Sequence, residues 1–192
     1  MTTFNRAALF GGAMTVELPT GFADVSDIRQ VPDHQEVYLD KDGFTSIIFD
    51  INERVTTTNT DADALQFHLG DIVEGSEGLK TWFSDSTTLK QLPNTPTYTL
   101  FVTQHTASPG SESVKAPGAD FTGILLILIR LEAQKTDLVV TVNVPHTRGN
   151  YAPEEIDLEA SKTGKLLGAA LIYRDKILET LDVKDWGLFV QQ

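Results

Sequence analysis

Four β-rich runs follow one another through the chain, and this succession limits the fold more than any other feature. Each run is dominated by β-branched, aromatic and aliphatic residues, which favour strands. The runs cover residues 79–92, 97–105, 121–131 and 138–144. A short polar turn at residues 134–137 joins the last two, so we expect a mostly antiparallel meander.

The most apolar segment of the chain, residues 123–129, lies inside the third run and ends at Arg130. A helix that spans a membrane needs about 20 consecutive apolar residues. The segment is far shorter than that, so we expect a buried strand.

Two hairpins are expected before the meander. The pair Gly11-Gly12 separates residues 8–10 from residues 14–18, and glycine tolerates the positive backbone angles of a tight turn. Residues 40–43 end in Asp-Gly, a strong turn signal, between residues 35–39 and 44–51. In this last run Ile47, Phe49 and Ile51 share one side and Ile48 lies on the other, which predicts that both faces of the sheet are covered.

Two amphipathic segments predict helices. Residues 61–74 carry apolar side chains at helical spacing after Thr60, a residue suited to an N-cap. Near the end of the chain a second apolar face consists of Leu166, Ala170, Tyr173, Ile177 and Leu181. The segment 185–189 should fold back onto the domain, and residues 106–119 have the composition of a mobile loop. We therefore expect one α+β domain over residues 1–192.

The chain is acidic and contains no cysteine. Fifteen Lys and Arg residues against 27 Asp and Glu residues give a net charge of −12. This charge disfavours nucleic acid and anionic membranes as partners and suits a basic protein surface. The lack of cysteine excludes disulfides and thiolate chemistry. The first residues of the sequence lack the apolar run that is typical of a secretion signal. We expect residence in the nucleus or the cytoplasm.

Catalytic motifs have little support. The segment 78–81 lacks the spacing of a phosphate-binding loop, and residues 75–78 are one residue short of a serine-hydrolase elbow. The four histidines are scattered, and only His68 has a carboxylate at helical spacing, in Asp71. We interpret that pair as a solvated contact on a helix surface rather than a metal or acid-base site.

The acidic residues are the better candidates for function. One group lies in and beside the Val-Pro-Asp corner, where Asp33 and Glu36 are accompanied by Arg29, His34 and Gln35. The other lies at the end of the strand 44–51 and consists of Asp50 and Glu53. On a regular strand Asp50 and Glu53 would point to opposite faces. We expect the strand to end, twist or bulge near Asn52, which would bring both carboxylates to one exposed edge. The plainer alternative is that they only solubilise a strand end.

Several segments in fixed order carry a resemblance that spans nearly the whole chain. The strongest block holds LFGGAM at residues 9–14, LPTGF at 18–22 and VPDHQEV at 31–37. Further matches are SIIFD at 46–50, QFH at 66–68 followed by Asp71, IRL at 129–131, TDLV at 136–139, NVP at 143–145 and LF at 188–189. On these segments the chain resembles the Ran guanine-nucleotide release factors.

The resemblance implies a PsbP-like α/β/α sandwich, with a largely antiparallel six-stranded sheet and helices on both faces. It implies a regulatory binding protein, not an enzyme, that binds the small GTPase Ran, promotes release of its nucleotide and supports nuclear import. An acidic pair associated with Ran binding maps onto Asp50 and Glu53, and neighbouring positions map onto Asp33, Gln35 and Glu36. Arg29 and His34 belong to the same corner.

The same resemblance sets the expected partners and location. We expect Ran as the partner, the chromatin-bound Ran exchange factor as a further candidate, and no direct nucleic acid, membrane, cofactor or metal. The protein should be a monomer in the nucleus and cytoplasm. Two alternatives remain: a PsbP-like small-molecule or metal-binding module using His68 with Asp71 or the loop 106–119, and a hydrolase using Asp50 or Glu53 with His68.

Overall fold

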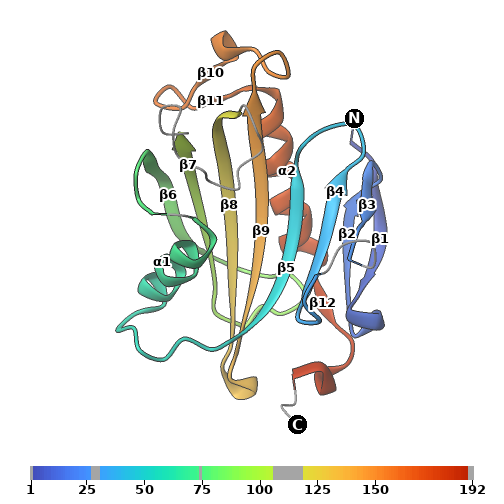
Figure 1. Cartoon of the computed structure of the whole chain (residues 1–192). Coiled ribbons are helices and arrows are strands. Elements are labelled where there is room, and N and C mark those ends of the chain that lie inside the picture. Colours follow the sequence, from blue (N-terminus) through green and yellow to red (C-terminus); the bar gives the residue numbers. More distant parts are fainter. Residues whose placement is uncertain (1, 27–30, 74, 106–118, 190–192) are drawn as a thin grey trace.

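The computed structural model describes residues 2–26, 31–73, 75–105 and 119–189 of the 192-residue chain. Its helices and strands, drawn in Figure 1, are β1 (Phe4–Leu9), η1 (Phe10–Gly12), β2 (Met14–Pro19), β3 (Phe22–Asp24), β4 (Gln35–Asp40), β5 (Ser46–Glu53), α1 (Asp61–Ile72), β6 (Leu79–Thr87), β7 (Thr97–His105), β8 (Ala119–Leu131), η2 (Glu132–Gln134), β9 (Thr136–Thr147), η3 (Pro153–Glu155), β10 (Ile156–Asp157), β11 (Lys162–Thr163), α2 (Gly164–Thr180), β12 (Asp182–Val183) and η4 (Trp186–Phe189). The expected loop 106–119 lies outside the described residues except for its last position.

A seven-stranded antiparallel sheet in the order β3-β4-β5-β9-β8-β7-β6 forms the centre of the molecule. The expected meander is therefore confirmed for β6 to β9. The expected count of six strands is wrong by one. The edge strand β3 has only three residues, which is too short to produce a periodic pattern in the sequence.

The long strands agree closely with the β-rich runs. β7 has the predicted bounds, and the apolar segment 123–129 lies inside β8, where it is buried as expected. The predicted end of the first strand is wrong, because β6 stops at Thr87 rather than at residue 92. Beyond it the backbone N–H of Lys90 donates to the carbonyl of Leu178 in α2 at 3.0 Å, so the chain has left the sheet.

Two apolar clusters cover the two sides of the sheet, and α1 and α2 lie on opposite sides of it (Figure 1). On one side α1 packs over β7, β8 and β9 through Leu65 and Leu69, which join Leu100, Leu126 and Val139. The other cluster contains α2, β2 and the opposite sides of β5, β8 and β9. The expectation that both faces are covered holds in the middle of the sheet. On the α1 side of β4 and β5, residues such as Ile48 stay half-buried.

Both predicted helices form. Thr60 caps α1: its hydroxyl accepts from the backbone N–H of Asp63, and the Asp63 carboxylate accepts from the Thr60 backbone N–H. The predicted apolar face of α2 is confirmed for Ala170, Ile177 and Leu181, which are fully buried. Leu166 and Tyr173 pack half-buried against the same cluster, and in the first turn the fully buried residue is Leu167. Within the described ranges, neither helix is long and apolar enough to cross a membrane.

The first predicted hairpin belongs to a separate three-stranded sheet of order β1-β2-β12. Gly11 has a positive φ of 66° in the turn, as the Gly-Gly pair predicted. The C-terminal segment folds back as expected: the backbone N–H groups of Lys184 and Asp185 donate to the carbonyl of Ala13, and Phe189 is buried in the core. The C-terminal segment is thus held against the turn of the first hairpin.

Candidate functional site

The β4–β5 hairpin brings the Val-Pro-Asp corner next to Asp50. Gln35 lies directly opposite Asp50 in the antiparallel register. The side-chain amide of Gln35 donates to Asp50 Oδ2 at 3.0 Å, and His34 Nε2 lies 3.7 Å from Asp50 Oδ1. These contacts gather three of the residues that the sequence singled out. We call Asp33, His34, Gln35 and Asp50 the corner cluster.

Backbone contacts hold the corner cluster in place. The backbone N–H of Gln35 donates to the carbonyl of Pro32 at 2.9 Å, and that of Ile51 donates to the carbonyl of His34, also at 2.9 Å. Asp33 is exposed. The His34 side chain is 54% exposed and that of Asp50 is 23% exposed, so both can be reached from solvent. Arg29, the remaining residue of the predicted corner, lies outside the described residues.

Glu36 lies on the other side of the sheet from Gln35 and Asp50. It pairs with Phe49, whose side chain is in the α2-side core. The backbone N–H of Phe10 donates to Glu36 Oε1, which ties β4 to the first hairpin. Burial, together with Asp24 and Glu36, raises the pKa of Tyr38. The structure therefore gives Glu36 a structural contact, and its contact with a partner stays a prediction.

Asp50 and Glu53 do not share a face. The pairing of β5 with β9 runs without a register shift from Ser46↔Asn143 to Glu53↔Thr136. Asp50 thus lies on the α1 side and Glu53 on the α2 side, as strict alternation requires. The expected bulge is wrong, whereas the expected strand end is nearly right, since β5 ends at Glu53. Glu53, the last residue of β5, is exposed.

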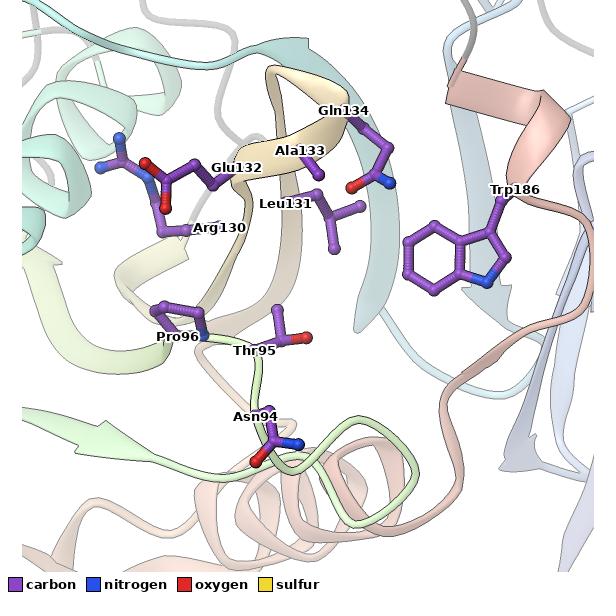
Figure 2. A pocket seen from close by; sticks show the side chains of 9 residues that line it. All are labelled: Asn94, Thr95, Pro96, Arg130, Leu131, Glu132, Ala133, Gln134 and Trp186. Atoms are coloured by element: carbon purple, nitrogen blue, oxygen red, sulfur yellow. The ribbon is translucent and has the colours of Figure 1, made fainter.

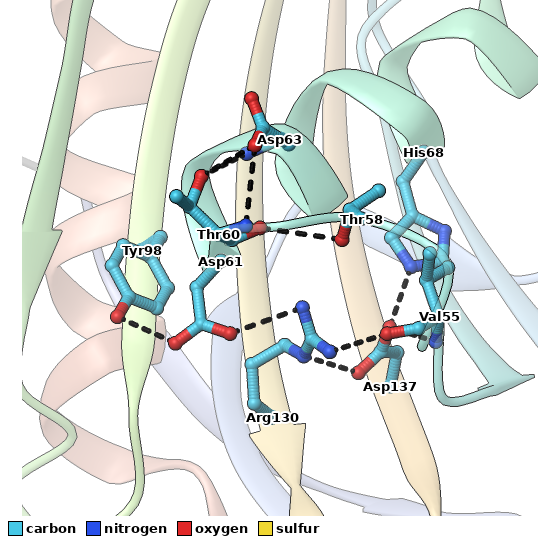
Figure 3. Close-up of polar contacts among 9 residues, drawn as sticks. All are labelled: Val55, Thr58, Thr60, Asp61, Asp63, His68, Tyr98, Arg130 and Asp137. Carbon is cyan, nitrogen blue, oxygen red and sulfur yellow. Dashed lines mark hydrogen bonds and ion pairs between the residues drawn. The ribbon is translucent and has the colours of Figure 1, made fainter.

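His68 is part of a buried polar network, shown in Figure 3. Only 4% of its surface is exposed, so the interpretation as a solvated helix-surface residue was wrong. Its Nε2 lies 2.9 Å from Asp137 Oδ2, and the expected partner Asp71 is not the residue it contacts. An Asp carboxylate only accepts, so Nε2 carries the proton in this pair.

Arg130 supplies the opposite charge at the centre of this network. Its Nε lies 2.8 Å from Asp137 Oδ1, and its Nη1 lies 3.2 Å from Asp61 Oδ1. These two nitrogens are close to oxygen without hydrogen-bond geometry, so the attraction is mainly Coulombic. Tyr98 donates its hydroxyl to Asp61 Oδ2 at 2.8 Å, and this bond is the main cause that raises the pKa of Tyr98.

The network fixes the connection between β5 and α1. Both backbone groups of Val55 take part: its N–H donates to Asp137 Oδ2 at 3.0 Å, and its carbonyl accepts from Arg130 Nη2 at 2.6 Å. Val55 follows Glu53 by two residues. The network therefore also sets where β5 ends. We did not identify Arg130 or Asp137 from the sequence as functional candidates, although a charged residue ending a strongly apolar run signals a buried ion pair.

The alternative sites find no support in these contacts. Among the described residues, His68 pairs with Asp137 while Asp50 pairs with Gln35 and His34, so the expected acid-base pair of His68 with Asp50 or Glu53 is not formed. Within the same ranges the structure groups no three His, Asp or Glu side chains in a way that could hold a metal ion.

A groove of about 440 Å³ lies at the end of the sheet where β8 turns into β9. Figure 2 shows Trp186 on one wall, facing Leu131 and Gln134, with the segment 94–96 along a third side. The sequence did not predict this groove, because its walls come from three segments that are distant along the chain.

A smaller recess of about 320 Å³ lies near the other end of β9, beside the first turn of α2. His146 borders it and is fully buried. Its ring stacks on Phe121 with 4.1 Å between centroids, and its Nδ1 donates to the carbonyl of Val144 at 2.8 Å. Burial lowers the pKa of His146. Its neutral form is therefore favoured in the folded protein.

Comparison with known proteins identifies consistent relatives. The family model described as Ran-interacting Mog1 protein matches residues 7–145. The probable ran guanine nucleotide release factor of Dictyostelium discoideum is 32% identical over 201 residues, covering 98% of this chain and 97% of that protein. The Ran guanine nucleotide release factor of Homo sapiens is 32% identical over 157 residues, covering 77% of this chain and 81% of that protein.

A solved structure is similar over almost the full length. The crystal structure of the Saccharomyces cerevisiae Ran-binding protein Mog1p matches with a TM-score of 0.74 and 28% identity, covering 99% of this chain and 100% of that one. The corner cluster and Glu53 lie inside the region that the family model matches, whereas Trp186 lies beyond it.

Proposed function

Because the chain belongs to the family of Ran-interacting Mog1 proteins, we propose that it binds the small GTPase Ran and promotes release of Ran's guanine nucleotide. The observation that carries the proposal is similarity to named Ran release factors and to Mog1p along nearly the entire chain. The role is that of a regulatory binding protein in nuclear import, as the relatives' names indicate.

The corner cluster and Glu53 are the proposed binding site. Asp50 is held by Gln35 with part of its side chain exposed, and Asp33 and Glu53 add negative charge at the same end of β5. Asp50 and Glu53 are three residues apart, or about 10 Å along the strand. A standard interface covers about 800 Å² per partner, roughly 30 Å across. One docked protein can therefore contact both carboxylates although they point to opposite faces.

Nucleotide release follows from linkage between two binding equilibria. A GTPase holds its nucleotide through a phosphate-binding loop, a lysine and a magnesium ion. We expect the protein to bind best to a Ran conformation in which these contacts are weaker, and its binding then lowers the affinity of Ran for nucleotide. Bound nucleotide lowers the affinity of Ran for the protein by the same factor. Excess free GTP should therefore displace the protein from Ran.

The detailed fold, the oligomeric state, the location in the cell and a further partner also belong to this proposal. The sheet between two helices supports a PsbP-like α/β/α sandwich. The monomeric state, residence in both nucleus and cytoplasm, and cooperation with the chromatin-bound Ran exchange factor are expectations from the resemblance. Each can be measured separately from Ran binding itself.

The test compares two double variants with equal change in charge. Asp50→Asn with Glu53→Gln removes two negative charges from the proposed site. Glu154→Gln with Glu155→Gln removes two exposed charges from η3, at the opposite end of the molecule (Figure 1). Release of a fluorescent nucleotide from Ran is followed after mixing, and affinity is measured by calorimetry at two salt concentrations.

We expect the site variant to lose at least about tenfold in affinity per residue, since one charge-assisted hydrogen bond contributes about 1.5–3 kcal/mol. The control should bind nearly as the original protein does, and high salt should weaken the original complex. If the folded site variant binds and releases at the original rate, the site is wrong. If the original protein neither binds Ran nor releases nucleotide, the function is wrong.

A further inference from the structure

Trp186 is a large apolar side chain held in an exposed position. Its surface is 40% exposed, whereas Phe189 in the same short helix is buried in the core. The two rings lie 5.9 Å apart between centroids. The backbone N–H of Asp185 donates to the carbonyl of Ala13, and that of Gly187 donates to Asp185 Oδ1 at 2.8 Å. Trp186 is therefore exposed on a fixed segment.

Trp186 forms one wall of the groove of about 440 Å³, opposite Leu131 and Gln134 (Figure 2). Glu132 belongs to the same lining and is exposed. Arg130 also borders the groove, but its charge is already paired with Asp137 and Asp61. Figure 2 shows the Glu132 carboxylate on the Arg130 side of the groove, away from the indole ring. The exposed indole face itself suits a cationic side chain, which can stack on the ring, and the net charge of −12 favours a basic partner.

The groove is continuous with the proposed Ran-binding site. Glu53 pairs with Thr136, two residues after Gln134, and the backbone N–H of Arg54 donates to the carbonyl of Lys135 at 2.9 Å. Glu53 also lies on the α2 side of the sheet, the side on which η4 packs. Figure 1 shows the end of β5, the β8–β9 turn and η4 at the same end of the molecule.

We propose that Trp186 extends the Ran-binding surface, with an Arg or Lys side chain of Ran seated in the groove against the indole ring. This inference rests on the proposed function. It explains how Glu53 can act with Asp50 from the opposite face: Ran covers the end of the sheet, with the corner cluster on one side and the groove on the other. Trp and Arg are the residues most enriched among those that dominate binding energy.

The first test is the affinity of Trp186→Ala for Ran. Truncation of an interface tryptophan that dominates the binding energy should weaken binding at least about 30-fold. Trp186→Phe should restore much of the affinity, because it keeps an aromatic face. Ile172→Ala is the matched control, since Ile172 is 52% exposed on α2 and its loss removes a similar exposed apolar side chain.

A second test does not depend on how the variant folds. The chain has two tryptophans, and Trp82 donates its indole N–H to Thr103 in the sheet at 2.8 Å. With 5-fluorotryptophan in this chain only, unlabelled Ran should shift or broaden the ¹⁹F signal of Trp186 and leave that of Trp82 nearly unchanged.

The outcomes separate the inference from the function. If Ran binds in a manner that depends on Asp50 and Glu53, while the Trp186 signal is unmoved and Trp186→Ala binds within threefold of the original, the groove is not part of the interface. If the original protein does not bind Ran at all, both the function and the groove assignment are wrong.

Discussion

The substitution Asp137→Asn removes one charge from the centre of the buried network and changes the shape of the side chain very little. Asp137 is fully buried, and its two oxygens face Arg130, His68 and the backbone N–H of Val55. An asparagine keeps one accepting oxygen and replaces the other with an NH₂ group. That group must then face a donor.

The expected cost can be worked out from the contacts that remain. Arg130 is 3% exposed, and among the described residues it would keep only Asp61, whose side chain is 33% exposed, as its counter-charge. Removing one partner of a buried ion pair costs about 3–5 kcal/mol, because the other charge is left buried without compensation. For a chain of this size, that loss corresponds to a fall of about 6–20 °C in the melting temperature.

Urea unfolding followed by circular dichroism measures the loss directly. The matched control is Asp175→Asn, since Asp175 also pairs with an arginine, Arg174 at 2.7 Å, but has a side chain that is 63% exposed. An exposed pair contributes at most about 1 kcal/mol. If Asp137→Asn costs no more than this control, the network is not the electrostatic anchor described above.

Two further predictions concern packing and pH. Burial lowers the pKa of His146 in the folded protein below the ordinary value of about 6.5 for histidine. At pH values between the two pKa values, the unfolded chain binds a proton at His146 that the folded chain does not. The free energy of unfolding therefore falls as pH decreases through this window. His146→Gln should lessen this fall relative to the original protein in melting curves at pH 7.5 and 5.5, and an unchanged slope would contradict the assignment. Gly123→Ala should cost about 1–3 kcal/mol in urea unfolding, because the added methyl group meets buried Leu167, whereas Gly70→Ala in α1 meets nothing and should stabilise by about 0.5–1 kcal/mol. Equal effects of the two glycine substitutions would refute that reasoning.

The elements that follow from local chemistry were predictable from the sequence. Thr60 and Asp63 lie three residues apart and cap α1 without help from the rest of the protein. Gly11 supplies the positive φ that its turn requires, and the β-rich run 97–105 gave the bounds of β7. In each case the physical cause lies within a few residues of its effect.

The features that depend on distant residues were not predictable in this way. His68 pairs with Asp137, 69 residues along the chain, and not with the nearby Asp71. The expected bulge near Asn52 was wrong because the regular ladder to β9 outweighs the cost of placing Glu53 on the apolar side at an exposed strand end. The groove at Trp186 likewise exists only after three remote segments have met.

The pairing of β2 with β12 has a consequence for protein synthesis. β2 is synthesised long before its partner at Asp182–Val183, because most of the chain lies between the two strands. Until then the nascent chain carries an unpaired strand edge, the kind of surface that promotes aggregation. Contacts between such distant residues also slow folding. A chain that terminates before Asp182 would keep this open edge permanently, so only chains that extend through Val183 can close the small sheet.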